Sequence, residues 1–399
     1  MVSFKSSLSA LLCLLPAAAL AETANLLVSH YNGNLYTLTL TTGSGTPSLA
    51  VTSSVKACGQ MPSWLTLDKE AKTVYCTDES GANTGSTLTQ LSVGANGVLK
   101  VTGTDRTPGG ELHSTLYGGS DGQGFIAAAE YDPSAIATFK LPLGSGTYLQ
   151  RFHYTMSGPG PNRARQDKPH PHSTFTDPTG KFLLSADLGA DLLRIFSISA
   201  DDGKLTECPA AQTGAADGPR HGSWWVPKAG STDGTMLYVA NELANSVTVW
   251  QATYPSGGSG CLTLKKTQSL SAYPAGKSAP ANSKTAEVHT AGNFVYATNR
   301  NDKSFGATQD SVATYSVDPA TGALTFVEST DAHAYYTRTF QINKAGTLVA
   351  FGGQTSSNVA IVERNTTTGR LGSLVANLVV GTPGTAGNED GLSAVIWDE

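Results

Sequence analysis

The stretch Phe182-Leu183-Leu184-Ser185-Ala186-Asp187 is an apolar run that ends on a carboxylate, and its form recurs along the chain. Further runs of the same kind, each ending near polar side chains, occupy residues 26–31, 74–79, 125–131, 236–242, 294–300 and 348–354. The runs start roughly 50 to 58 residues apart, and several are followed by a second strand-like run. A repeat of this length, with about four strands per unit, predicts an all-β fold, a seven-bladed β-propeller.

Repeated units that pack around one axis can bury sheet faces that a single unit would leave exposed. One unit alone cannot bury both faces of its sheet, whereas units packed side by side in a ring can. The alternatives are a pair of β-sandwiches, which would not keep this period, and a β-helix, whose repeat is shorter. A strand beginning near Asn25 and the segment 392–397 would close the ring by sharing one blade.

The N-terminus has the form of a secretory signal peptide. Lys5 gives a positive start, residues 11–20 form a short apolar core, and Ala19-Leu20-Ala21 is a small-x-small cleavage site. The alternative is an apolar first strand. We expect a signal peptide over 1–21 with cleavage after Ala21, a secreted protein, and a single propeller domain over 22–399. No later run is long enough to cross a bilayer, so no membrane interaction is expected.

The cysteines predict disulfides in an exported protein. Removal of Cys13 with the signal peptide would leave four cysteines, which allow three pairings. Proximity in sequence favours Cys58–Cys76 and Cys208–Cys261. No Cys-x-x-Cys spacing occurs, so metal binding is a poorer explanation of these residues.

Charge and motifs exclude some classes of function. Charged residues make up 14% of the chain, the formal net charge is −5, and no basic run or stripe occurs. Nucleic acid is therefore not expected as a partner. The chain has no Gly-x-Ser-x-Gly motif, so it lacks the nucleophile signal of one large class of serine hydrolases.

The repeat would bring polar residues together at one mouth of the propeller channel. The strand ends would contribute His30, Tyr31, Asp78, Glu79, Glu130, Tyr131, Asp187, Asn241, Glu242, Asn299, Arg300 and Gln354. The preceding segments would contribute Ser63, His113, His172, His221, Lys284 and Arg338. Water in the channel mouth would solvate polar side chains, and this accounts for most of these residues without a functional role. One group on consecutive blades differs, because it combines a candidate base with candidate anion binders. This group is His172, Arg220, His221, Glu242 and Arg300.

Two motifs have some of the features of metal sites. His170-x-His172 supplies two imidazoles but no evident third ligand, and Asp187-x-Gly189-x-Asp191 lacks the rest of an EF-hand loop. The second motif is more typical of a turn. No metal is assigned to either.

Several motifs together resemble a known family. They are His-Pro-His at 170–172, Ala-Asp-Leu-Gly-Ala-Asp at 186–191, Pro-Arg-His at 219–221, Ala-Asn-Glu-Leu at 240–243 and Tyr-Ala-Thr-Asn-Arg at 296–300. In combination and order they are similar to the seven-bladed lactonase family, which includes bacterial 6-phosphogluconolactonases and fungal carboxy-cis,cis-muconate cyclases. The resemblance covers most of the chain after the signal segment and is clearest over 170–370.

The resemblance implies an active site in the propeller mouth that needs no cofactor and no metal. It implies catalytic positions at His172, Arg220, Glu242 and Arg300. Neighbouring positions at which we expect contacts with substrate are His170, His221, Asn241, Asn299 and Arg338. The ligand that it implies is a small anionic lactone or the corresponding open-chain acid.

We expect an enzyme that opens or closes a lactone ring, either a lactonase or a lactonising cyclase of the muconate type. Arg220 and Arg300 would hold carboxylate or phosphate, or stabilise an oxyanion, because guanidinium groups match these anions. Either Glu242 or His172 would act as general base, and the other would protonate the leaving oxygen.

Two other functions are compatible with the same residues. A non-enzymatic secreted propeller that binds a sugar or a protein would tolerate changes at Glu242 and Arg300. A metal-dependent lactonase of another propeller family would gather carboxylates and amides from several blades. The residues that could supply them are Asp78, Glu79, Glu130, Asp187 and Asn241.

Overall fold

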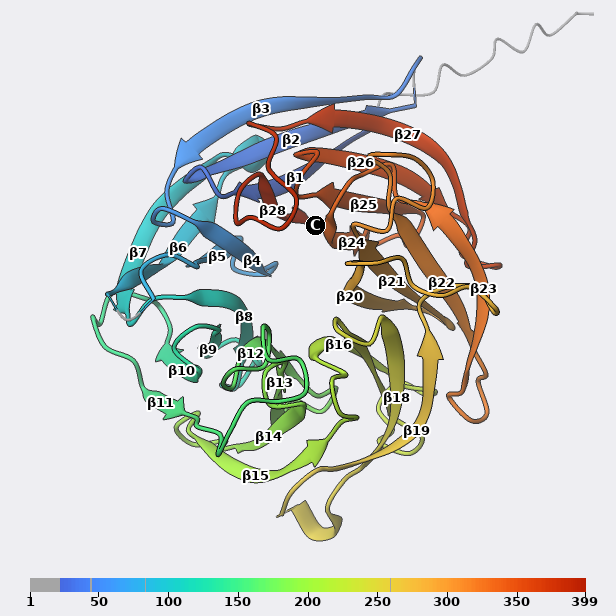
Figure 1. Cartoon of the computed structure of the whole chain (residues 1–399). Coiled ribbons are helices and arrows are strands. Elements are labelled where there is room, and N and C mark those ends of the chain that lie inside the picture. Colours follow the sequence, from blue (N-terminus) through green and yellow to red (C-terminus); the bar gives the residue numbers. More distant parts are fainter. Residues whose placement is uncertain (1–21, 44, 83, 259) are drawn as a thin grey trace, which may run out of the picture.

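The computed structural model describes residues 22–43, 45–82, 84–258 and 260–399. These residues form seven four-stranded sheets, arranged like blades around one axis (Figure 1). The predicted seven-bladed β-propeller is confirmed. The expected signal peptide, residues 1–21, lies outside the described residues. Within the described ranges, no helix is long and apolar enough to cross a membrane.

Each blade has an innermost strand, and the innermost strands of successive blades contact one another around the axis. The innermost strands are β4 (Pro62–Asp68), β8 (Glu111–Tyr117), β12 (Pro171–Thr176), β16 (Pro219–Trp225), β20 (Lys284–Ala291), β24 (Thr337–Ile342) and β28 (Leu392–Trp397). The second strands are β5 (Thr73–Asp78), β9 (Phe125–Glu130), β13 (Phe182–Asp187), β17 (Met236–Asn241), β21 (Phe294–Arg300), β25 (Leu348–Gly353) and β1 (Glu22–His30).

The outer half of each blade completes the sheet. The third strands are β6 (Ser86–Val93), β10 (Ala135–Lys140), β14 (Leu192–Ile198), β18 (Ser246–Thr253), β22 (Ser311–Val317), β26 (Asn358–Arg364) and β2 (Asn34–Thr42). The outermost strands are β7 (Leu99–Thr107), β11 (Gln150–His153), β15 (Leu205–Gln212), β19 (Thr263–Ser271), β23 (Leu324–Asp331), β27 (Leu371–Val379) and β3 (Ser48–Lys56). The helical turns of the described chain are η1 (Ala95–Gly97) and η2 (Ser256–Gly258).

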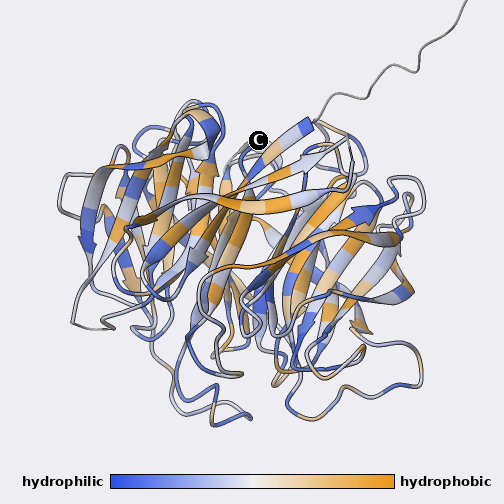
Figure 2. Ribbon diagram, turned by 90° about the horizontal axis from the view of Figure 1, so that it is seen from above, coloured by the Kyte–Doolittle hydropathy of each residue, from blue (hydrophilic) through white to orange (hydrophobic). Residues whose placement is uncertain are grey.

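The repeated apolar runs are the second strands of the blades. Strands β5, β9, β13 and β17 are buried along their whole length, because neighbouring blades cover both faces of each sheet. Leu184 of β13 and Leu237 of β17, for example, belong to one apolar cluster between two blades. Burial on both faces explains why these runs are continuously apolar instead of alternating. Figure 2 shows apolar residues gathered along the strands.

The first and last strands share one blade, as the sequence predicted. Strand β28 pairs with β1, and Leu26 lies opposite Trp397 in the register. The ring is therefore closed by hydrogen bonds between the two ends of the described chain (Figure 1). This closure leaves no unpaired edge at the junction of the two strands.

Both predicted disulfides are confirmed. Cys58–Cys76 joins β5 to the segment before β4, and its Cα atoms are 5.8 Å apart. Cys208–Cys261 joins β15 to the segment before β19, across two neighbouring blades, with a Cα separation of 5.7 Å. The second bond closes a loop of 53 residues and the first a loop of 18. The longer loop is expected to gain more from the restriction of the unfolded chain.

Candidate active site

A β-bulge near the start of the innermost strand positions the central side chains. Register shifts occur at this point in β4, β8, β12, β16 and β24. The extra residues at these bulges are Ser63, Leu112, His172, Arg220 and Arg338. The residues that follow them are Trp64, His113, Ser173, His221 and Thr339. A bulge leaves one residue unpaired and changes the direction of its side chain. The side chains of these consecutive residues can therefore lie in different surroundings.

Two cavities lie along the axis. The first, called the arginine cavity, has a volume of about 280 Å³. It is lined by Tyr31, Glu79, Leu112, Tyr131, Arg165, His172, Arg220, Glu242, Lys284, Arg300, Tyr336, Arg338, Gln354, Gly387, Asn388 and Glu389. The second, called the histidine cavity, lies further along the same innermost strands and has a volume of about 340 Å³. Its polar and aromatic lining includes Trp64, His113, Ser173, His221, Glu287, His289, Thr339 and Phe340.

Glu242 is at the centre of the arginine cavity. It follows β17 and its side chain is 1% exposed. The nearest cationic nitrogens are Arg165 Nη1 at 2.5 Å, Arg300 Nη2 at 2.5 Å and Arg220 Nε at 3.1 Å, and Lys284 Nζ lies 3.9 Å away. The Glu242 carboxylate is thus surrounded by basic groups from two neighbouring blades and from the loop before β12.

The basic groups control the charge of this carboxylate. Burial alone would raise the pKa of Glu242, but Arg165, Arg300, Lys284 and Arg220 together hold the pKa of its carboxyl below its usual range. Glu242 is therefore ionised and a poor acceptor of protons. Burial lowers the pKa of Lys284 to about 8, although the Glu242 charge opposes this shift. Lys284 can consequently exchange a proton close to neutral pH.

The arginine cavity has an excess of basic side chains. In the described part of the chain, its lining contains five basic residues, Arg165, Arg220, Lys284, Arg300 and Arg338. Its acidic residues are three, namely Glu79, Glu242 and Glu389. An anionic ligand would balance this excess, and guanidinium groups bind phosphate and carboxylate well.

His172 is the candidate base of the arginine cavity. Its ring is buried and lies edge-to-face with Tyr131, at 5.7 Å between ring centroids. Burial, followed by the Arg220 charge, lowers the pKa of His172 well below its ordinary value. Its Nδ1 atom has no hydrogen-bond partner among the described residues. A neutral imidazole at this position can accept a proton from a bound water or substrate.

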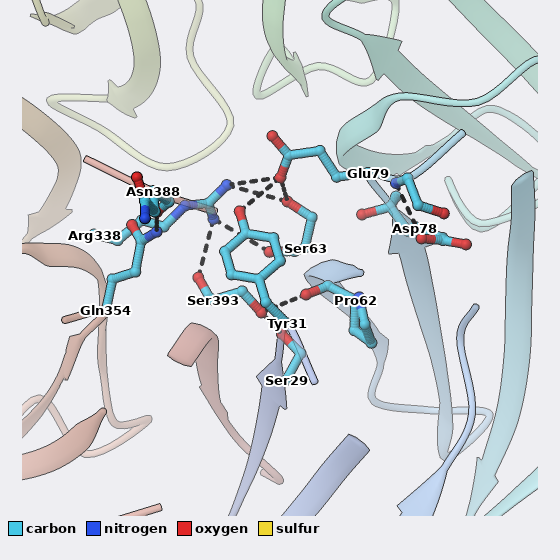
Figure 3. A network of polar contacts seen from close by, with 12 residues as sticks. Ser29, Tyr31, Pro62, Ser63, Asp78, Glu79, Arg338, Gln354, Asn388 and Ser393 are labelled. Atoms are coloured by element: carbon cyan, nitrogen blue, oxygen red, sulfur yellow. Dashed lines mark hydrogen bonds and ion pairs between the residues drawn. The ribbon is translucent and has the colours of Figure 1, made fainter. Parts of the chain in front are cut away.

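A second polar network fixes the other side of the cavity (Figure 3). Glu79 Oε2 accepts hydrogen bonds of 2.6 Å from the Tyr31 hydroxyl and from Ser63 Oγ. Arg338 donates to Ser63 Oγ at 3.1 Å and to the Ser393 carbonyl at 3.0 Å, and it lies 3.5 Å from Glu79. These bonds join three blades and hold the Arg338 guanidinium in place beside the cavity.

A comparison with known protein families identifies the family of the chain. The family model described as "Lactonase, 7-bladed beta-propeller" matches residues 25–387. The chain belongs to this lactonase family. The predicted family membership is therefore confirmed.

Named relatives align with most of the length of this chain. It is 32% identical over 315 residues to a protein of Arthroderma benhamiae named "Probable 6-phosphogluconolactonase", with coverage of 78% of this chain and 75% of the relative. It is 26% identical over 325 residues to the 6-phosphogluconolactonase of Formosa agariphila, with coverage of 80% and 85%. The solved structure of a periplasmic gluconolactonase from Pseudomonas aeruginosa has a TM-score of 0.73 at 23% identity, over 94% of this chain and 99% of that chain. The last likeness shows the shared fold.

The structure brings many of the predicted site residues of the chain together. The four expected catalytic positions and one expected substrate contact line the arginine cavity. They are His172, Arg220, Glu242, Arg300 and Arg338. Their chemical roles stay predictions, but their convergence from separate blades is now a structural observation.

The other expected substrate contacts lie outside the lining of the arginine cavity. The Asn241 amide donates to Ser246 Oγ and Thr248 Oγ1, at 3.1 and 3.2 Å. The Asn299 amide donates in the same way to Ser311 Oγ at 3.0 Å. These asparagines connect second and third strands of their blades. Their contacts with substrate stay untested predictions.

His170 contacts the cavity wall from behind. Its ring stacks on Tyr131 at 4.2 Å between centroids, and its Nε2 lies 2.9 Å from Asp167 Oδ1. Its backbone N–H donates to Asp187 Oδ1 at 2.7 Å. In this structure His170 supports Tyr131, which does line the cavity, and its direct contact with substrate stays a prediction.

His221 lies beside His172, at 5.1 Å between ring centroids, but it does not line the arginine cavity, and its contact with substrate stays a prediction. His221 lines the histidine cavity, and His113 lies there with it. The register gives the reason, because His221 follows the bulge residue Arg220 and is therefore equivalent to Ser173 on β12. Arg220, not His221, is the counterpart of His172.

Sequence analysis missed Arg165 and gave too little weight to Lys284 and Glu79. Arg165 lies in the long loop between β11 and β12, where no repeat marks it. The loop is anchored by Gln166, whose amide donates to the Leu188 carbonyl at 3.1 Å. Lys284 could have been found, because it occupies the start of β20 and pairs with Arg300 in the register.

Two of the carboxylates considered for the rival metal site are paired with arginines. In the described ranges, no group of three or more His, Cys, Asp and Glu side chains is arranged to hold a metal ion. Asp187, one of the carboxylates considered for such a site, is bound by Arg194 at 2.7 Å. Glu130 is bound in the same way by Arg151, at 2.8 Å.

Proposed function

We propose that this lactonase hydrolyses a small anionic lactone in the arginine cavity, with a phosphorylated sugar lactone as the first candidate. The observation that carries the proposal is a buried Glu242 carboxylate surrounded by arginines in a cavity with excess positive charge. A phosphate or carboxylate group would balance that excess. The names of relatives at 32% and 26% identity support the same class of substrate.

Arg220 and Arg300 are proposed to bind the anionic group or the oxyanion that forms during the reaction. Each has a buried nitrogen without a partner among the described residues, Arg220 Nη1 and Arg300 Nε. These groups can donate hydrogen bonds to a substrate after a small adjustment. Glu242 orients both guanidinium groups and is a positioning residue in this proposal, because its low pKa makes it a weak base.

His172 is proposed to be the general base. It would take one proton from a water molecule whose oxygen attacks the carbonyl carbon of the lactone. The bond between that carbon and the ring oxygen would break, and Lys284 would protonate the leaving oxygen. The new carboxylic acid would return a proton to Lys284. The reaction would then leave a carboxylate, an alcohol and one proton on His172.

A panel of substrates in a pH-stat tests this function. The panel contains 6-phosphogluconolactone, unphosphorylated gluconolactone and a carboxylated muconolactone, and carboxymuconate absorbance follows the cyclase direction. We expect acid release above the spontaneous rate with the phosphorylated lactone, and loss of this activity in His172→Gln. Turnover of carboxymuconate alone would assign the cyclase reaction instead. No turnover of any compound would overturn the proposal and favour a binding propeller.

We also propose that the chain is exported. The support is the pair of disulfides, because such bonds persist mainly in oxidising compartments. Mass spectrometry of the protein from culture medium should find an N-terminus at Glu22. Retention in the cytosol with an intact N-terminus would contradict export.

A further inference from the structure

A column of titratable side chains leads from the arginine cavity into the histidine cavity. It starts at His172, whose ring lies 5.1 Å from the ring of His221 between centroids. His221 Nδ1 lies 3.0 Å from Glu287 Oε1, and His289 Nε2 lies 3.6 Å from the same oxygen. His289 is the outermost member, with 32% of its side chain exposed. The column therefore connects the candidate base with solvent at the other end of the axis.

The protonation states of the column suit transfer of a proton. Burial, followed by the Arg220 charge, lowers the pKa of both His172 and His221 well below the ordinary value. Burial also raises the pKa of Glu287, although His289 opposes this shift. Glu287 Oε2 has no partner among the described residues. A proton that reaches these imidazoles is therefore held weakly, while Glu287 can accept it.

The surroundings differ at the two ends of the column. His113 and Trp64 pack against His221 at 5.0 and 5.3 Å between ring centroids, and Phe340 packs against His289 at 4.7 Å. The charged groups that face the column from the arginine cavity are Arg220, Arg300 and Arg338. Those that line the outer part of the histidine cavity are Lys69, Lys344 and Glu399. The nearest fixed charges thus favour movement of a proton away from the arginines.

The proposed hydrolysis requires a path by which a proton can leave His172. Each turnover leaves one proton on His172, while the anionic product still occupies the mouth. The basic groups of the arginine cavity repel a proton that would leave in that direction. Glu287, whose Oε1 lies 3.0 Å from His221 Nδ1, is in the opposite direction.

We propose that His221, Glu287 and His289 relay this proton from His172 to solvent at the far end of the histidine cavity. The inference rests on the proposed lactone hydrolysis. Only N–H and O–H bonds change: His172 loses its proton to His221, His221 passes one to Glu287, and Glu287 passes one through His289 to water. Ring rotation or one bridging water connects the nitrogens of His172 and His221. None of the three relay residues is itself part of the arginine cavity lining.

Variants at the far end of the relay test the proposal on the full chain. His289→Gln and Glu287→Gln should lower kcat on the lactone that wild type hydrolyses by about tenfold, less than the ~10²–10⁴-fold of direct acid–base groups. KM should stay unchanged, because the substrate does not contact these residues. The solvent deuterium isotope effect on kcat should increase. Added imidazole buffer should restore much of the lost kcat in His289→Gln, which a merely structural defect would not allow.

His333→Gln is the matched control. His333 is also partly exposed and pairs with a carboxylate, Asp331, at 3.2 Å, but it lies outside both cavities. It should keep wild-type kcat and isotope effect. If both relay variants match wild type in kcat, isotope effect and buffer response, the relay is wrong even though hydrolysis stands. If wild type itself hydrolyses no lactone, the proposed function fails first, and the relay fails with it.

Discussion

The arginine cavity and the histidine cavity are lined by neighbouring residues of the same strands, yet the side chains in them differ. The first has an excess of basic groups, whereas the second contains imidazole and aromatic rings. On β16, Arg220 lines the first cavity and His221 lines the second. On β12, His172 and Ser173 divide in the same way. The bulge at the start of each strand separates the paired side chains. One repeated unit therefore presents two surfaces, and only one of them has the charges for an anionic substrate.

The two cavities also stabilise buried polar groups in different ways. In the arginine cavity, the Glu242 carboxylate offsets part of the cost of burying several cations close together. In the histidine cavity, burial lowers the pKa of His113 and His221 so far that both rings are neutral. The first arrangement has the charge that a negative ligand would complement, whereas the second contains the groups of the proposed proton relay.

Of the changes proposed here, Glu242→Gln in the arginine cavity should cause the largest loss of activity. Without the carboxylate, the guanidinium groups of Arg220 and Arg300 repel each other and lose their common anchor. We expect kcat/KM on the phosphorylated lactone to fall by about 10²-fold or more, with a higher KM and a lower kcat. Steady-state kinetics measures both constants, and circular dichroism checks that the variant is folded.

Glu328→Gln is the control for that substitution. Glu328 also pairs with an arginine, Arg370, but neither residue lines the arginine cavity or the histidine cavity. Its kcat/KM should stay within about twofold of wild type, as for most surface changes. Equal losses in the two folded variants would show that the arginine cavity is not the site of reaction.

Arg300→Lys should have a smaller effect that depends on the substrate. Lysine keeps the charge but lacks the planar fork that binds phosphate through two hydrogen bonds. We expect KM for the phosphorylated lactone to rise by about tenfold, and KM for the unphosphorylated lactone to change less. Kinetics on both lactones measures the difference, with Arg370→Lys as the control. The same rise for both lactones would argue against contact between Arg300 and the anionic group.

The pH dependence should show the smallest effect. Lys284 must be protonated to act as the acid, and its pKa is lowered to about 8. Since protonated Lys284 disappears as the pH rises, kcat/KM at half a pH unit above that value should be about a quarter of its plateau at lower pH. His172 stays neutral above its lowered pKa, so the acidic limb should lie below pH 6.5. A pH–rate profile corrected for spontaneous hydrolysis measures this, and an unchanged alkaline limb in Lys284→Gln would assign it to another group.

The sequence predicted the fold well because the repeat has a simple physical cause. Burial on both faces makes each second strand a continuous apolar run, as in 182–187, and these runs are visible without any structure. The shared blade of β1 and β28 was predicted from the first and last strand-like runs of the chain. Both disulfides were predicted from the proximity of their cysteines in sequence.

The site was predicted only in part, because local backbone geometry and long loops decide the rest. A bulge changes which cavity a residue lines, so the adjacent residues Arg220 and His221 cannot be told apart by period alone. Arg165 reaches Glu242 from a loop that no repeat describes. Glu287 lies inside the irregular part of β20, between Thr285 and Val288, and gave no signal of its contact with His221.

A crystal structure of the wild-type protein soaked with 6-phosphogluconate, the product of the proposed reaction, tests the central claim most directly. Our account predicts the ligand in the arginine cavity, with its phosphate or carboxylate within hydrogen-bonding distance of Arg220, Arg300 or Lys284. Density for the ligand only in the histidine cavity, or in neither cavity at a concentration that inhibits turnover, would contradict the account.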